Sequence, residues 1–313
     1  MSLFTQTQLQ EAWSRLPERL RSTPTVASRT PGLYLKLETL QPTGSYKIRA
    51  AYTRILARKQ ETTEMALSSS GNFAAAFAWA ADQLKVRPHI VVTPQVNPKK
   101  MELAKRYPCQ IHVCGARYES RFETLSKLES KGVEIIDHRN CKTVFLGHST
   151  IGWELLCEAT KFDRVLIPVS TGGLAIGVGA ALRAGGYRGE ILGVQSSGNP
   201  TLYESWRAGR PVPQHEIETV CDALTATSIP NEPFKHLSEL LDDILIVEES
   251  SVLPAVGYFL EEEGLIVEPG AAVGLAALLE LQRPWKRSLL VLTGSIVDDD
   301  LLFEGLRRYR ALP

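Results

Sequence analysis

The chain contains 313 residues, of which 44% are hydrophobic and 22% are charged. This composition is typical of one or two globular domains that fold unaided, and it argues against a disordered chain. Lysine plus arginine and aspartate plus glutamate number 35 each, so no excess of positive charge favours nucleic acid or an anionic membrane as a partner. We therefore expect a small-molecule partner. Residues 1–15 are polar and lack the apolar core of a signal peptide, so we expect a cytoplasmic protein.

The first half of the chain alternates short apolar, β-branched runs with helical patterns. This alternation predicts an α/β protein in which crossover helices connect the strands of a parallel sheet. Up to residue 141 we expect strands at 65–67, 89–93, 110–114 and 133–137, and helices at 72–84, 97–107 and 119–131. These elements form one compact unit.

The pattern restarts at residue 150 and predicts a second sheet. We expect helices at 150–159, 174–184, 250–263 and 270–281, and strands at 164–169, 190–195, 244–247 and 288–293. Residues 208–233 are rich in proline and polar side chains and lack periodicity, so we expect a long loop that passes near a site.

Lys47 follows a turn at Gly44 and is predicted to open a helix. A lysine that forms a Schiff base must be desolvated enough to react as a neutral amine. Its place beside a turn leaves the side chain free to reach into a cleft. Arg49, two residues later, is expected to have a structural role nearby.

Two further segments lie between a strand and a helix, where free backbone N–H groups bind anions. The first segment is suited to a substrate carboxylate and contains Ser69, Ser70, Gly71 and Asn72. The second segment is suited to a phosphate, because its glycines let the backbone approach closely, and it contains Ser170, Thr171, Gly172, Gly173 and Leu174. The chain has neither a G-x-G-x-x-G motif nor a P-loop lysine, which argues against a nucleotide.

Thr293, at the end of the last predicted strand, and Glu268, before a predicted helix, complete the candidate set. In this order along the chain, the motifs resemble those of fold type II pyridoxal-phosphate enzymes, the tryptophan synthase β-like class. The variant Gly-Ser-Tyr-Lys-Ile-Arg, with Ser-Ser-Gly-Asn and Val-Glu-Pro, is most similar to serine/threonine dehydratase and serine racemase. The resemblance covers most of the chain, from about residue 36 to residue 299.

The resemblance implies two parallel-sheet, three-layer domains and a pyridoxal 5'-phosphate cofactor. It implies a large cofactor-binding domain, residues 1–52 plus 142–313, and a small substrate-side domain, residues 53–141. Lys47 then carries the cofactor, residues 170–174 hold its phosphate, and Asn72 contacts its phenolic oxygen. Thr293 bonds the pyridine nitrogen, and Glu268 lies near the ring.

On the substrate side, the resemblance implies that residues 69–72 bind the carboxylate and that Ser70 faces the substrate carbon as a second catalytic residue. His148 is a further candidate for substrate contact. Two departures from the family pattern stand out. Phe73 occupies a position that is often histidine in dehydratases and racemases, and residues 195–201 lack the acidic ligands of the metal-dependent members, so we expect no metal.

The family pattern implies a homodimer and an ammonia lyase that converts a serine- or threonine-like β-hydroxy amino acid to a 2-keto acid and ammonia. A hydroxyl at Thr293 cannot hold the pyridine nitrogen protonated, which favours chemistry at Cβ over transamination. Three alternatives stay open: a β- or γ-replacement synthase of the cysteine or threonine synthase type, an amino-acid racemase, and a non-catalytic protein on this fold.

Overall fold

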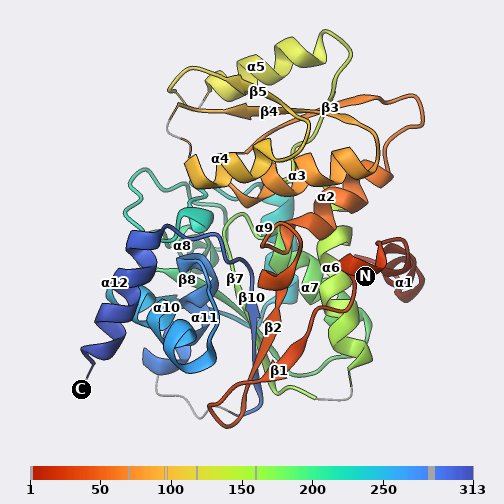
Figure 1. Cartoon of the computed structure of the whole chain (residues 1–313). Helices are drawn as coiled ribbons and strands as arrows, with labels where there is room; N and C mark the ends of the chain where they lie inside the picture. The colour runs from red at the N-terminus through yellow and green to blue at the C-terminus, as the bar shows by residue number, and fades with distance from the viewer. Residues whose placement is uncertain are drawn as a thin grey trace.

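The structure is a computed structural model that describes residues 3–69, 71–94, 96, 98–117, 119–158, 161–280 and 286–312. It contains two sheets, each flanked by helices (Figure 1). The six-stranded sheet has the order β1-β2-β10-β7-β8-β9, in which β1 is antiparallel to β2 and the other neighbours are parallel. Its strands are β1 (Thr25–Ala27), β2 (Leu33–Leu37), β7 (Arg164–Pro168), β8 (Glu190–Ser196), β9 (Asp243–Val247) and β10 (Ser288–Leu292).

Helices cover both faces of this sheet. One apolar cluster joins the sheet to α1 (Gln6–Ser14), α6 (Lys142–Cys157), α7 (Gly173–Ala184) and α9 (Asn231–Leu240). The cluster on the other face includes α10 (Glu249–Glu263) and α11 (Pro269–Glu280), and α12 (Asp299–Arg310) packs against α10. Strands β7 and β10 are buried along their whole length, which is typical of a parallel sheet covered on both sides. We call this part the large unit.

The four-stranded sheet is parallel throughout, with the order β5-β4-β3-β6. Its strands are β3 (Glu64–Ser68), β4 (Arg87–Val92), β5 (Gln110–Val113) and β6 (Glu134–Ile135). Helices α3 (Asn72–Gln83) and α4 (Pro98–Lys105) lie between this sheet and the large unit, and α5 (Ser120–Glu129) covers its outer face (Figure 1). Residues 72–81 are all buried, as expected for a helix enclosed on every side. We call this sheet with α3, α4 and α5 the small unit.

Most predicted elements are found within a few residues of their expected bounds, but one helix is longer than predicted. Helix α6 begins at Lys142 rather than at residue 150. Gly147 interrupts the apolar pattern there because α2 (Lys47–Leu56) packs against this turn, where a Cβ atom on Gly147 would lie 2.5 Å from the Ala50 Cα atom. Several elements of the large unit were not predicted from the sequence, namely α1, β1, β2, α8 (Thr201–Ala208), α9 and α12.

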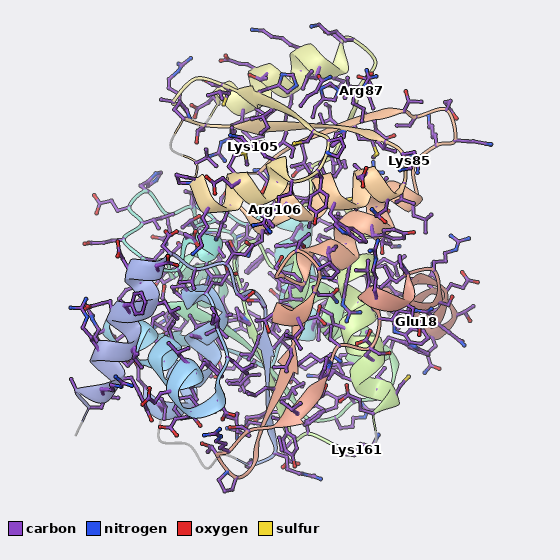
Figure 2. The ribbon with its side chains drawn as sticks, viewed as in Figure 1. Glu18, Lys85, Arg87, Lys105, Arg106 and Lys161 are labelled. Carbon is purple, nitrogen blue, oxygen red and sulfur yellow. The ribbon has the colours of Figure 1, made fainter. Side chains whose placement is uncertain are left out.

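Charged side chains of both signs are spread over the surface of the molecule. The exposed residues Glu18, Lys85, Arg87, Lys105, Arg106 and Lys161 are labelled in Figure 2. In the part of the chain that the structure describes, no helix is long and apolar enough to cross a membrane.

Candidate active site

A cavity of about 610 Å³ lies where the small unit meets the large unit, and it gathers most of the predicted site residues. Several of its walls are the first turns of helices, where backbone N–H groups and the helix dipole favour anions. These turns belong to α2, α3, α4 and α7. The predicted residues on its lining are Lys47, Ser69, Gly71, Asn72, Ser170, Thr171, Gly172, Gly173, Leu174, Glu268 and Thr293.

Lys47 is the first residue of α2. Its ammonium nitrogen lies 4.6 Å from the centre of the Tyr46 ring and 5.9 Å from the centre of the Phe73 ring. Burial lowers the pKa of Lys47 from 10.5 to about 8, although the Glu268 carboxylate acts in the opposite direction. A useful fraction of the amine is therefore neutral near physiological pH, as a nucleophile or a base requires.

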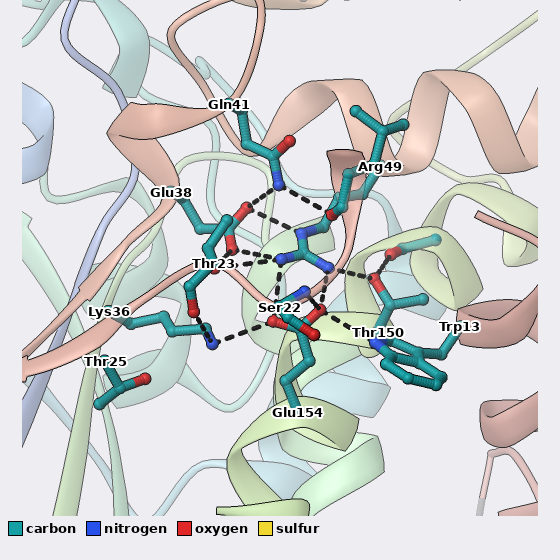
Figure 3. Close-up of polar contacts among 12 residues, drawn as sticks. Trp13, Ser22, Thr23, Thr25, Lys36, Glu38, Gln41, Arg49, Thr150 and Glu154 are labelled. Carbon is teal, nitrogen blue, oxygen red and sulfur yellow. Dashed lines mark hydrogen bonds and ion pairs between the residues drawn. The ribbon is translucent and has the colours of Figure 1, made fainter. Parts of the chain in front are cut away.

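A buried ionic network holds the start of α2 in place (Figure 3). The Arg49 guanidinium is fully buried and donates two hydrogen bonds to Glu38 and two to Glu154, over 2.6–3.0 Å. Lys36 of β2 forms a second ion pair with Glu154 at 3.0 Å. Because Arg49 is two residues from Lys47, these contacts fix the turn of helix that carries the lysine.

Asn72 and Glu268 both line the cavity and contact each other there. The Asn72 side-chain nitrogen, Nδ2, donates to both Glu268 carboxylate oxygens, at 2.8 and 3.0 Å. Burial raises the pKa of Glu268, and Asp222 adds to that effect, whereas Lys100 and Asn72 oppose it. The Asn72 carbonyl oxygen, Oδ1, is buried and has no hydrogen-bond partner among the described residues.

The segment from Ser170 to Leu174 leads from β7 into α7. Gly172 has φ +94°, a conformation that favours glycine, and a Cβ atom there would lie 2.5 Å from a Leu237 methyl carbon. The chain therefore turns sharply and presents the first N–H groups of α7 to the cavity. This arrangement suits a phosphate.

Thr293 directly follows β10 and also lines the cavity. The Tyr46 N–H donates to the Thr293 carbonyl oxygen at 3.1 Å, and Ser45 forms an isolated antiparallel bridge with Gly294. The Glu268 N–H donates to the Gly294 carbonyl oxygen at 2.9 Å. These backbone contacts bring the segments of Lys47, Glu268 and Thr293 together, although they are far apart in the sequence.

The small unit contributes residues that the sequence analysis did not single out. Lys100 of α4 lines the cavity and contacts both Glu268 and Asp222. His138 stacks on Phe73 with 4.9 Å between ring centres. Burial and the nearby Lys47 charge lower the pKa of His138 to about 4, so the ring is neutral at physiological pH. Only the chemical type of these residues could have marked them, because no local motif surrounds them.

Two predicted residues are placed differently from the rest. Ser70 lies outside the described residues. His148 was expected to contact substrate, but it lies within α6, is 1% exposed and does not belong to the cavity lining. Its ring instead packs against Tyr46, with 4.8 Å between ring centres. The long reach of α6 toward α2 explains this burial.

Gln195 stands where the metal-dependent relatives were expected to have an acidic ligand. Its side chain accepts hydrogen bonds from the backbone N–H groups of Leu202 and Tyr203, at 2.8 and 3.0 Å, and donates to the Val169 carbonyl at 3.2 Å. The side chain thus ties the start of α8 to the end of β7. The expectation that no metal binds here stays a prediction.

The cavity residues fit pyridoxal phosphate. Lys47 offers a reactive amine, the α7 turn offers a phosphate cradle, and the buried Asn72 carboxamide has hydrogen-bonding capacity left over beside them. Fold and site together define a fold type II pyridoxal-phosphate enzyme.

Comparison with known proteins leads to the same class. Residues 17–294 match the family model described as pyridoxal-phosphate dependent enzyme, and the chain belongs to that family. The chain is 28% identical over 275 residues to an L-threonine ammonia-lyase of Thermotoga maritima, which covers 86% of this chain and 68% of that protein.

Two solved structures are similar over nearly the whole chain. Maize serine racemase has a TM-score of 0.89 at 28% identity, covering 98% of each chain. The T.th. threonine deaminase has a TM-score of 0.87 at 30% identity, covering 94% of this chain and 99% of that one. The expected family, fold class and cofactor dependence are thereby confirmed.

Proposed function

We propose that this protein is a pyridoxal-phosphate-dependent amino-acid ammonia lyase. Its substrate is a serine- or threonine-like β-hydroxy amino acid, which it converts by α,β-elimination to a 2-keto acid and ammonia. The observation that carries the proposal is Lys47, a buried amine with a pKa of about 8 at the meeting point of an anion-binding helix start and the Asn72–Glu268 pair. The similarity to threonine ammonia-lyase and threonine deaminase supports this choice of reaction.

We assign the cofactor contacts as follows. Lys47 holds the cofactor covalently through its amine, residues 170–174 bind the phosphate, and Asn72 donates to the phenolic oxygen. The Thr293 hydroxyl bonds the pyridine nitrogen, and Glu268 lies beside the ring. When bound, the cofactor supplies an electron sink for the negative charge that develops at the substrate Cα atom.

The substrate side is formed by the start of α3. Ser69, Gly71 and Asn72 offer the substrate carboxylate the N–H groups of a helix N-terminus, and Ser70 remains a proposed proton carrier. With cofactor and substrate bound, the free Lys47 amine would remove the Cα proton as general base. The β-hydroxyl would take up a proton and leave as water, and hydrolysis of the released enamine would yield the keto acid and ammonia. His148 is proposed to act on substrate only indirectly, because it packs beneath Tyr46.

The test is formation of 2-keto acid by the purified, cofactor-loaded protein without any second nucleophile. The substrate panel is serine, threonine, their O-phospho and O-acetyl forms, and hydroxyaspartate. We expect keto acid from a free hydroxy amino acid, and none from the Lys47→Ala variant, which serves as the control. If no member of the panel yields keto acid, the lyase proposal is wrong and a synthase that requires a second substrate becomes the better candidate.

A racemase is the second candidate, because maize serine racemase is similar over 98% of this chain, more than either the ammonia-lyase or the deaminase described above. The two activities are distinguished by chiral analysis of the remaining amino acid in the same reactions. Appearance of the opposite enantiomer without keto acid would favour the racemase.

We further propose the division into a large domain, residues 1–52 plus 142–313, and a small domain, residues 53–141. The separate six- and four-stranded sheets support this division.

A homodimer in the cytoplasm also remains a proposal. The large unit exposes the apolar side chains of Leu40, Ile266 and Phe303, which would be buried in a subunit interface. Size-exclusion chromatography with light scattering tests the dimer.

A further inference from the structure

Glu268 belongs to the large unit, but the side chains that donate to it come from the small unit. Asn72, at the start of α3, donates to both carboxylate oxygens. Lys100, in the first turn of α4, donates to Glu268 Oε2 at 3.3 Å and to the two Asp222 oxygens at 2.7 and 2.8 Å. The network therefore exists only when the two units lie together as they do here.

Burial makes the Lys100 contact decisive for the charge of Glu268. The Glu268 side chain is 1% exposed and the Lys100 side chain 3%, whereas Asp222 is 47% exposed. A carboxylate taken out of water remains ionised only if a cation and hydrogen-bond donors replace its solvation. Among the residues that the structure describes, the titratable groups that interact with Glu268 are Lys100 of α4, Asp222 of the 3-10 turn η3 (Asp222–Leu224), and Tyr46 and Lys47 at the start of α2.

We propose that Lys100 is a positioning residue for the cofactor: its ammonium keeps Glu268 ionised, and the ionised Glu268 fixes the orientation of the Asn72 carboxamide. A carboxylate accepts hydrogen bonds only, so Asn72 must turn Nδ2 toward it. The two Glu268 oxygens lie in nearly the same direction from Nδ2 and share one of its hydrogens, so the other hydrogen is left for the phenolic oxygen of the cofactor. A protonated Glu268 donates instead, which favours the flipped carboxamide and takes that hydrogen away from the cofactor.

Lys99, the preceding residue, is a matched control. Its ammonium also crosses to the large unit, donating to the Val297 carbonyl at 2.8 Å and to Asp299 at 2.6 Å. It is 46% exposed, its carboxylate partner is 79% exposed, and these contacts lie outside the Glu268 network. Lys99→Met therefore removes a contact between the units without touching the proposed mechanism.

The first arm of the test uses the cofactor-free protein, so it does not depend on the proposed function. Thermal midpoints of wild type, Lys100→Met and Lys99→Met are measured at pH 8 and pH 5.5. Burial already raises the pKa of Glu268, and removal of the Lys100 charge raises it further, so Lys100→Met loses more stability than wild type as pH rises. Relative to wild type, we expect the thermal midpoint of Lys100→Met to be lowered more at pH 8 than at pH 5.5. The midpoint of Lys99→Met should be lowered equally at both pH values.

Adding Glu268→Gln to Lys100→Met removes the uncompensated charge and should recover part of the deficit at pH 8. The proposal would be overturned if Lys100→Met lowered the thermal midpoint equally at both pH values and the double variant recovered none of that loss. If Lys100→Met does not fold, the proposal requires that the double variant does; an unfolded double variant also overturns it.

The second arm follows the visible absorption of the bound cofactor against pH, and this arm rests on the proposed function. We expect the midpoint of the spectral change in Lys100→Met to shift by about 1–3 pH units from wild type, the range for losing a charge within a few ångströms. Lys99→Met should titrate like wild type. An unshifted Lys100→Met spectrum would overturn the link to the cofactor. Failure of the wild type to bind cofactor would instead refute the proposed function, while the first arm still decides the role of Lys100.

Discussion

Replacement of Arg49 by leucine tests whether the buried network of Figure 3 stabilises the fold and the position of Lys47. The substitution removes the paired hydrogen bonds to Glu38 and Glu154 at 2.6–3.0 Å. Glu154 keeps its ion pair with Lys36 at 3.0 Å. Glu38 is fully buried and keeps neutral donors, Thr23 at 2.6 Å and Gln41 at 3.2 Å, but no other cation pairs with it among the described residues.

Removal of one partner of a buried ion pair costs about 3–5 kcal/mol, because the remaining charge is left without compensation. At about 2 °C per kcal/mol for a chain of this size, the midpoint of thermal unfolding should fall by about 6–10 °C. The matched control is Arg308→Ala, which breaks a surface pair with Glu304 at 2.8 Å and should lower the midpoint far less, because water screens that pair.

The loss should also depend on pH. Burial by itself would raise the pKa of Glu154, but Arg49 and Lys36 together lower it below 4.5. A depressed carboxylate pKa stabilises the fold above the unfolded value, and this contribution is lost as pH falls through the folded value. The gap between wild type and Arg49→Leu should therefore narrow below about pH 4.5.

Calorimetry or circular dichroism at several pH values measures these effects. Addition of Glu38→Gln to Arg49→Leu should restore part of the lost stability, since it neutralises the stranded carboxylate. A deficit for Arg49→Leu no larger than that of Arg308→Ala at pH 7 would refute the reasoning.

Two further predictions concern the cofactor site. The rate of cofactor incorporation into the cofactor-free protein should rise with pH up to about 8 and then level off, because only the neutral Lys47 amine reacts; a rate that keeps rising to pH 10 would contradict this. Gly172→Ala should lower both stability and cofactor affinity by about 1–3 kcal/mol, since its φ is +94° and Leu237 fills the Cβ position. Equilibrium cofactor titration checks this, with Gly186→Ala as control, because Gly186 has φ +80° and open space around it.

The sequence by itself determined the fold class, the family and most helix starts around the cavity. Helix starts have local signals, because neighbouring residues set backbone conformation and helix capping. Here the signals are the turn before Lys47, the serine and asparagine at the start of α3, and the glycines before α7. The same locality accounts for the misplaced start of one helix. Helix α6 was expected to begin at residue 150 because Gly147 interrupts the apolar pattern of its first turns. A glycine is needed at that position because a larger residue would clash with Ala50, which is distant in the sequence.

Only the tertiary structure decided which polar and charged side chains meet. Asn72 and Glu268 are 196 residues apart, Lys100 and Glu268 are 168 apart, and Arg49 and Glu154 are 105 apart. No periodicity marks such pairs, because their partners are brought together by the packing of whole sheets and helices. The same packing buried His148 within α6 and made Lys100 part of the cavity. Local chemistry therefore specified the motifs, and burial on folding specified the charges that surround them.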